Sequence, residues 1–199
     1  MDQWLQLVPD SVANLPDGLR NLLFQLYQTF IAADRWKWFA NGLKITFIVT
    51  VGALILGVII GLLIAIVRTA HDSRRAGKNN IILSILNLIC RLYLTVIRGT
   101  PMMVQLLIMG FVIMVPKDDT ARLACGIVTL GINSGAYVAE IVRGGLMSVN
   151  PGQMEAGRSL GLNYAQTMRL IVIPQAIKNI LPALGNEMIT LLKDTSRVS

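Results

Sequence analysis

Three ionisable residues lie inside or beside long apolar segments of this chain. Arg91 and Arg98 interrupt one apolar stretch, and Glu140 lies near the end of another, three residues before Arg143. Charged side chains are costly in the hydrocarbon region of a membrane, where they often mark a transport pathway. Arg98 and Glu140 could therefore face a pathway for a charged solute. The alternatives are that each pairs with another protein group, or that both lie near the membrane interface and extend toward water.

Few other residues could do chemistry. His71, the only histidine, lies in a basic loop, so no arrangement of serine, histidine and aspartate is available. Cys90 and Cys125 both lie in apolar runs, and their spacing matches no metal site. The phosphate-binding pattern Gly-x-x-x-x-Gly-Lys-Ser/Thr does not occur. We therefore expect a chain that is not an enzyme, holds no metal and does not hydrolyse ATP itself.

The composition of the 199-residue chain is typical of a membrane protein. Hydrophobic residues make up 54% and charged residues 15%, and the mean hydropathy is +0.60. A soluble domain carries about 25% charged residues, so a soluble globular fold and a disordered chain are both disfavoured. The formal net charge of +7 comes from basic residues between apolar runs. Such charges orient a membrane protein, and binding of nucleic acid is not expected.

Apolar runs predict the membrane-spanning helices. Residues 45–67 carry no charge over 23 residues, which gives roughly 34 Å of helix and one full crossing. The loop that follows is rich in basic residues, which assigns it to the cytoplasm and the N-terminus to the outside. Residues 123–142 predict another span. Residues 175–192 predict a weaker one, which should face protein or a cavity because it contains a proline, an asparagine and a glutamate.

Residues 81–115 allow two interpretations. They could form two short spans, or one span broken at Thr100 and Pro101, since proline disfavours helical geometry in the residue before it. The charges favour the broken span, because it keeps the arginine-containing segment after residue 143 in the cytoplasm. The predicted fold class is therefore all-α, a polytopic transmembrane helical bundle with about four crossings.

The N-terminal segment, residues 1–37, is less apolar than the rest. Leucines and a phenylalanine recur at helical spacing from Leu19 to Phe30, which predicts an amphipathic helix along one membrane surface. Two tryptophans follow, and such rings prefer the headgroup region. The first residues lack the pattern of a cleavable signal, so insertion is expected to rely on a retained span. Residues 38–199 are expected to form the transmembrane domain.

A fixed pattern of residues lies in a hydrophilic cytoplasmic stretch of about residues 148–170 and just after it. The pattern is Glu155-Ala156-Gly157, then Gly161 after three intervening residues, then Ile171-Val172-Ile173-Pro174 after nine more intervening residues. It resembles the EAA loop of ABC-importer permeases, with Gly157 in place of the second alanine and Ile173 in place of a leucine. The alternative is an ordinary surface helix followed by a turn.

The resemblance implies how this loop works. In the family it forms a short helix, a turn and a return to the membrane, and the helix docks on a cytoplasmic ATPase subunit. Three residues lie at helical spacing and could fill a groove on that subunit: Met154, Gly157 and Leu160. Glu155 near the helix start would suit the helix dipole. Gly161 would end the helix, and Pro174 would restart the following span.

Further motifs narrow the resemblance to polar amino-acid permeases of the histidine, glutamine and arginine type. The motifs are Ile97-Arg98-Gly99-Thr100-Pro101 with Gln105, the run from Ser134 to Gly145, and the run from Leu192 to Ser196. The resemblance implies a substrate pathway with Arg98, Gln105 and Glu140, in which Arg98 and Glu140 could meet the carboxylate and the ammonium of an amino acid. It also implies the type I ABC-importer permease fold. The family has five crossings, so the chain is expected to be truncated before its last span.

The resemblance also implies the setting, an ATP-driven importer of polar amino acids in the bacterial inner membrane. Expected partners are cytoplasmic ATPase subunits that bind ATP and Mg²⁺, a second identical or similar permease, a periplasmic or lipid-anchored amino-acid-binding protein, and the lipid bilayer. No cofactor is expected in this chain. Two alternatives stay open. One is a secondary transporter driven by an ion gradient, because broken spans suit that class, and the other is a truncated remnant that only assembles with its partners.

Overall fold

A computed structural model describes residues 16–72 and 81–195 of the chain. This part is mostly helical and contains no strand, which confirms the all-α class. In chain order its elements are α3 (Asp17–Phe30), η1 (Ala32–Asp34), α4 (Trp36–Asp72), α5 (Ile81–Gly99), α6 (Met102–Ile108), η2 (Met109–Ile113), α7 (Asp119–Met147), α8 (Pro151–Ser159), α9 (Tyr164–Thr167), η3 (Met168–Val172) and α10 (Ile173–Thr195). The prediction about a signal sequence concerns residues outside this described part.

The chain divides into two compact units, Met1–Ile45 and Thr46–Ser199. In the first unit the predicted amphipathic helix is present as α3. Four of its apolar residues share one side and are exposed, namely Leu19, Leu22, Leu26 and Phe30, whereas Leu23 and Phe24 are half-buried. An i,i+3 pair between Asp17 and Arg20, 2.5 Å apart, stabilises the first turn of this helix.

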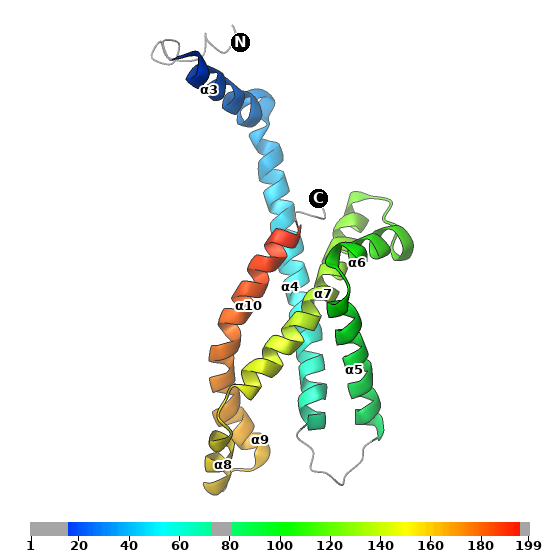
Figure 1. The fold of residues 1–199 in the computed structure, drawn as a ribbon, viewed down its shortest axis with the longest axis vertical. Helices are drawn as coiled ribbons and strands as arrows, with labels where there is room; N and C mark the ends of the chain where they lie inside the picture. The colour runs from blue at the N-terminus through cyan, green and yellow to red at the C-terminus, as the bar shows by residue number, and fades with distance from the viewer. Residues whose placement is uncertain (1–15, 73–80, 196–199) are drawn as a thin grey trace. The chain divides into compact units, whose positions relative to one another are not determined.

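In the second unit α7 is the central helix. Two-thirds of its most apolar window is buried, 67%, against 33% for α4 and 11% for α5. Figure 1 shows α7 crossing this unit diagonally, and its residues contact α10 and α5. The helices α4, α5 and α7 are each long and apolar enough to cross a membrane. The helix α10 covers the predicted last span but is less apolar, as its polar residues lead us to expect.

Small residues allow α4 and α7 to approach closely. A Cβ atom added at Gly61 of α4 would lie 2.6 Å from Cγ1 of Val138, and one added at Gly135 of α7 would lie 2.8 Å from Cγ2 of Ile60. Neither space is available to a larger side chain. Glycine at such positions is typical of helix contacts in membranes, where packing rather than water drives association.

The predicted break in the second apolar segment is present. The helix α5 ends at Gly99, and α6 begins at Met102 after Pro101. The apolar piece beyond the break, Met102–Ile113, is shorter than a membrane span. This length favours one broken crossing over two complete ones. Among the described helices α4, α5 and α7 qualify as spans by length and composition, and the fourth crossing at α10 stays a prediction.

Candidate functional site

Glu140 is the centre of an ion-pair cluster that joins three helices. Its carboxylate accepts a hydrogen bond of 2.6 Å from Arg68 of α4. The guanidinium groups of Arg143 on α7 and Arg98 on α5 lie 3.7 and 4.0 Å from it. Hydrogen bonds between charged groups are stronger than neutral ones. Glu140 therefore connects α4, α5 and α7, whose contributing residues are far apart in the sequence.

The cluster brings together two of the three predicted pathway residues, Arg98 and Glu140. Glu140 already has Arg68 on one carboxylate oxygen, so its negative charge is engaged within the protein. Arg98 is held less tightly, because 45% of its side chain is exposed, against 15% for Arg68. Its guanidinium also lies 5.6 Å from the ring centre of Tyr137, within the range of a cation–π contact.

Gln105, the third predicted pathway residue, makes its contacts at the helix break instead. Its side-chain nitrogen donates to the carbonyl of Ile97 at 2.7 Å and to the hydroxyl of Thr100 at 2.8 Å. Its side-chain oxygen accepts a hydrogen bond of 3.0 Å from Asn133 of α7. The last carbonyls of a helix lack partners within the helix. Gln105 supplies one and fixes the break against the central helix.

The helix α8 begins earlier than the sequence suggested. Asn150 accepts a hydrogen bond of 2.8 Å from the backbone N–H of Gly152, and Pro151 is the first helical residue. Both residues are strong start signals. Glu155 consequently lies in the middle of α8 rather than in its first turn. The expectation that Glu155 benefits from the helix dipole was wrong, because Asn150 and Pro151 start the helix more than one turn before Glu155.

Gly161 ends α8, as predicted. Its φ angle is +87°, a left-handed conformation that glycine adopts without strain. The N–H of Gly161 donates to the carbonyl of Arg158 at 3.0 Å, and the N–H of Leu162 donates to that of Gly157 at 3.2 Å. This pair of bonds is the Schellman motif, which satisfies the free carbonyls at a helix end.

The three residues expected to fill a groove on a partner do not share one environment. Gly157 is buried, and a Cβ atom there would lie 2.5 Å from Cγ2 of Thr167. Met154 packs against the cluster of Val149 and Val172. Only Leu160 is free for a partner, with 81% of its surface exposed. The returning chain covers the Gly157 side of α8, and docking of Met154 and Leu160 on a partner stays a prediction.

The returning chain is helical before Pro174 is reached. The helix α9 starts with a capping box, in which Asn163 and Gln166 each bond the other's backbone N–H. It continues directly into the π-helix η3 and then α10. Pro174 is the second residue of α10, so it does not restart the segment as expected. Proline has no N–H to donate, and the wider π-turn just before it is a common adjustment in helices.

The other residues of the predicted loop pattern differ in exposure. Glu155 and Ala156 are exposed on α8, and Ile173 and Pro174 are exposed at the start of α10. Ile171 is half-buried beside Gly157, where its Cδ1 atom would lie 2.9 Å from an added Cβ.

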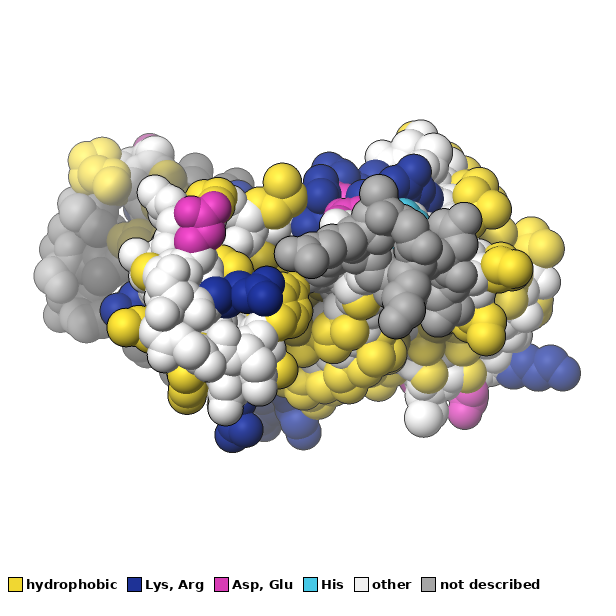
Figure 2. Space-filling view, turned by 90° about the horizontal axis from the view of Figure 1, so that it is seen from below, with side chains coloured by type: hydrophobic (Ala, Val, Ile, Leu, Met, Phe, Trp, Pro, Cys, Tyr) yellow, Lys and Arg dark blue, Asp and Glu magenta, His cyan; other side chains and the backbone are white. Residues whose placement is uncertain are grey.

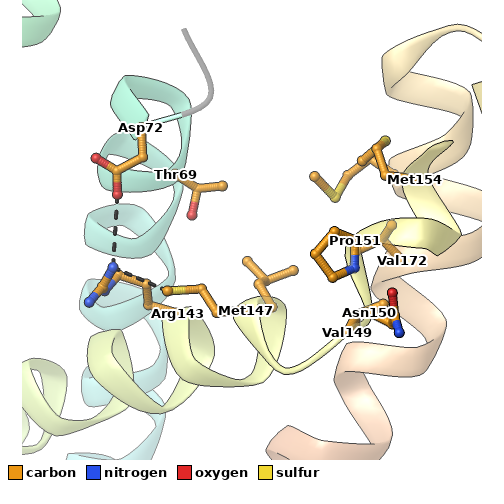
Figure 3. A pocket seen from close by; sticks show the side chains of 11 residues that line it. Thr69, Asp72, Arg143, Met147, Val149, Asn150, Pro151, Met154 and Val172 are labelled. Carbon is orange, nitrogen blue, oxygen red and sulfur yellow. Dashed lines mark hydrogen bonds and ion pairs between the residues drawn. The ribbon is translucent and has the colours of Figure 1, made fainter.

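A cavity of about 310 Å³ lies between this loop and the ends of α4 and α7. Figure 3 shows Arg143 and Asp72 on one side of it and Met154, Pro151 and Val172 on the other. Arg143 lies 3.9 Å from the carboxylate of Asp72 and 3.2 Å from the sulfur of Met147. In Figure 2 basic and acidic side chains gather beside the one histidine of the chain, and His71 pairs with Asp72 at 3.5 Å.

Two side-chain contacts between helices could not be predicted from the sequence. Arg68 is the first charge of the basic loop, but it directly follows the uncharged run of residues 45–67 and therefore remains within reach of the membrane helices. Ser134 of α7 donates a hydrogen bond of 2.8 Å to Glu187 of α10. This contact agrees with the expectation that the last segment faces protein or a cavity, although the sequence did not indicate a partner for Glu187. Among the described residues no group of metal-binding side chains is found.

Residues 57–199 match the family model described as binding-protein-dependent transport system inner membrane component. This match covers most of the chain, including the Glu140 cluster and the loop around Gly161. The chain belongs to this family. The match begins within α4, so α3 and the first half of α4, residues 36–56, lie outside it.

Individual relatives of this inner membrane component are permeases named for amino acids. An arginine transport system permease protein of Corynebacterium glutamicum is 36% identical over 166 residues, which are 77% of this chain and 49% of the relative. A glutamine transport system permease protein of Escherichia coli is 38% identical over 158 residues, 78% of this chain and 67% of the relative. The chain thus spans about half of the first relative and about two-thirds of the second.

Two solved structures share the fold. An amino acid ABC transporter crystallised with histidines has a TM-score of 0.68 and 44% identity, over 80% of this chain and 70% of that one. The methionine ABC transporter MetNI in an inward-facing form has a TM-score of 0.54 over 77% of this chain and 67% of that one. Its identity of 23% makes this second likeness one of fold alone. Both likenesses agree with the expected type I permease fold.

Proposed function

We propose that this chain is a permease subunit of an ATP-driven importer of polar amino acids. Family membership and the arginine and glutamine permeases among its relatives support this proposal. ATP and Mg²⁺ would be bound by a partner ATPase and not by this chain. A binding protein would deliver the amino acid from outside, and a second permease would complete the pathway. The N-terminus would lie outside, with residues 1–37 as a separate segment and residues 38–199 as the permease domain.

The loop of residues 148–170 is the proposed docking element for the ATPase. The observation that carries this proposal is the two-sided environment of α8. One side is fixed to the returning chain through Gly157, and the other exposes Glu155, Arg158 and Leu160. Because η3 continues into α10, a force applied to α8 would be transmitted to a membrane helix. Such a lever allows ATPase closure to change the state of the pathway.

The substrate pathway is proposed to include Arg98, Gln105 and Glu140. The exposed guanidinium of Arg98 is the group most available to a carboxylate. Glu140 and Gln105 would contribute mainly by holding the helices that carry Arg98, since both are engaged by protein groups. The loop residues Glu155, Ala156, Gly157, Gly161, Ile171, Ile173 and Pro174 are proposed to form or support the ATPase dock.

Co-purification with a co-expressed ABC ATPase from the same organism tests the docking proposal. Gly161→Val should lose the ATPase, because a branched residue at φ +87° is strained by about 1–2 kcal/mol and the Schellman turn would open. Gly161→Asn is the matched control, since asparagine tolerates this conformation and the surrounding space is open. It should retain the ATPase.

A second substitution separates docking from folding of the loop. Leu160→Asp changes an exposed side chain, so the loop should fold normally while an apolar contact with the ATPase is lost. Retention of the ATPase by both Gly161→Val and Leu160→Asp, at wild-type yield, would contradict docking through this loop.

A further inference from the structure

A second cavity, of about 440 Å³, opens beside the Glu140 cluster, and positive charge predominates in its walls. It is lined by Arg68 of α4, Arg91 and Arg98 of α5, and Glu140 of α7. The remaining lining residues are uncharged: Leu94, Thr95 and Gly99. Three guanidinium groups therefore surround one carboxylate in this cavity.

The charges around this cavity are not balanced within residues 16–72 and 81–195. Arg68 holds the carboxylate of Glu140 at 2.6 Å, whereas Arg98 approaches it only to 4.0 Å, beyond hydrogen-bond distance. Arg91 has no ion pair or hydrogen bond to any described residue, and its side chain is exposed. If Arg143 and its partner Asp72 are included, four guanidinium groups face two carboxylates, an excess of two positive charges.

Unpaired positive charge at this position has a physical cost. Arg91 is on α5, one of the helices long and apolar enough to cross a membrane. Like charges repel one another more strongly near a low-dielectric membrane interior than in water, and an unpaired arginine within a span is unfavourable. A bound anion would remove both costs. The guanidinium group matches planar carboxylates and phosphates particularly well, because its donors form a fork.

We propose that this cavity is a binding site for an anionic oxygen group, a carboxylate or a phosphate, which Arg91 and Arg98 bind directly. Arg68 contributes mainly by neutralising Glu140, so that the acid does not repel the ligand. Two sources share this chemistry. One is the carboxylate of a transported amino acid, and this source rests on the proposed import function. The other is the headgroup phosphate of an anionic lipid, which does not depend on that function.

The test measures ligand-induced stabilisation of the full-length chain in an uncharged detergent, with thermal unfolding followed by far-UV circular dichroism, which reports the helices that line the cavity. Phosphatidylglycerol is compared with phosphatidylcholine, which carries no net charge. L-glutamine and L-arginine are each compared with the amine that lacks the carboxylate. The variants are Arg91→Gln and Arg98→Gln. Arg122→Gln is the matched control, because it removes an exposed arginine at the other end of α7.

At least one anionic ligand should raise the wild-type melting temperature above the value in its control compound. Arg91→Gln and Arg98→Gln should each raise the half-saturating concentration about tenfold or more, since hydrogen bonds to charged groups contribute about 1.5–3 kcal/mol. Arg122→Gln should respond as wild type. Without ligand, Arg91→Gln should melt at least as high as wild type, because a repulsive charge has been removed. The melting temperature without ligand therefore shows whether the Arg91→Gln variant is folded.

Each outcome has a defined meaning. Stabilisation by phosphatidylglycerol alone identifies a lipid headgroup, and stabilisation by an amino acid alone identifies a substrate carboxylate. No response to any of these anions, or an unchanged response in Arg91→Gln, overturns the proposal. The measurement contains no ATPase, so its failure is independent of failure of the docking experiment.

Discussion

The Glu140 cluster and the loop around Gly161 are stabilised in opposite ways. The cluster joins three helices through charged side chains, with Arg68 and Glu140 separated by 72 positions in the sequence. The loop is fixed by helix caps at Asn150 and Asn163 and by the contact of Gly157 with Thr167. All of these residues lie within one short segment of the chain. Loss of one charge should therefore weaken the whole bundle, whereas changes in the loop should act locally. The comparison predicts different consequences for substitutions of similar size.

The largest effect is expected at the cluster. Glu140→Gln should lower stability by about 3 kcal/mol, because it leaves the guanidinium of Arg68 without a counter-charge in a largely buried position. The measurement is the thermal unfolding temperature of the purified chain. Asp119→Asn is the matched control, because Asp119 pairs with Arg122 at the surface and 94% of its side chain is exposed. Such pairs contribute at most about 1 kcal/mol, and equal shifts in the two variants would contradict a structural role of the cluster.

An intermediate effect is expected at the contact between α8 and the returning chain. Gly157→Ala should destabilise the loop by about 1–3 kcal/mol, because the new Cβ would overlap Cγ2 of Thr167. Thr167→Ser should restore part of it, since serine lacks that methyl group yet keeps the hydroxyl that donates to the carbonyl of Asn163, while Cδ1 of Ile171 remains 2.9 Å from the new Cβ. Limited proteolysis of the loop measures both variants. Failure of the double variant to recover would show that the contact with Thr167 is not the cause.

The smallest effect is expected at the helix break. Gln105→Ala removes the side chain that joins the end of α5 to Asn133 of α7, at a cost of about 1 kcal/mol. Gln153→Ala is the control, because this glutamine makes a single exposed hydrogen bond to Gln175. A small decrease in unfolding temperature is expected only for the first variant. A larger decrease for Gln105→Ala than for Glu140→Gln would contradict the proposal that the Glu140 cluster stabilises the bundle more than the helix break does.

Local features of the fold could be predicted from the sequence because their causes are local. The break at Pro101 follows from the missing N–H and from the restriction on the preceding residue. The end of α8 at Gly161 follows from the conformational freedom of glycine. The start of α8 at Asn150 and Pro151 also has a local cause, because asparagine caps a helix N-terminus and proline suits its first position.

What the sequence by itself determined was the class of protein, the positions of the apolar helices and the loop pattern that links the chain to its family. These depend on composition, on runs of apolar residues and on fixed spacings along the chain. Only the tertiary structure decided that Arg68 engages Glu140, that Gln105 fixes the helix break, and that Gly157 faces the chain's own Thr167. Side chains on different helices meet according to how those helices cross and rotate. Spacing along one segment carries no information about that arrangement.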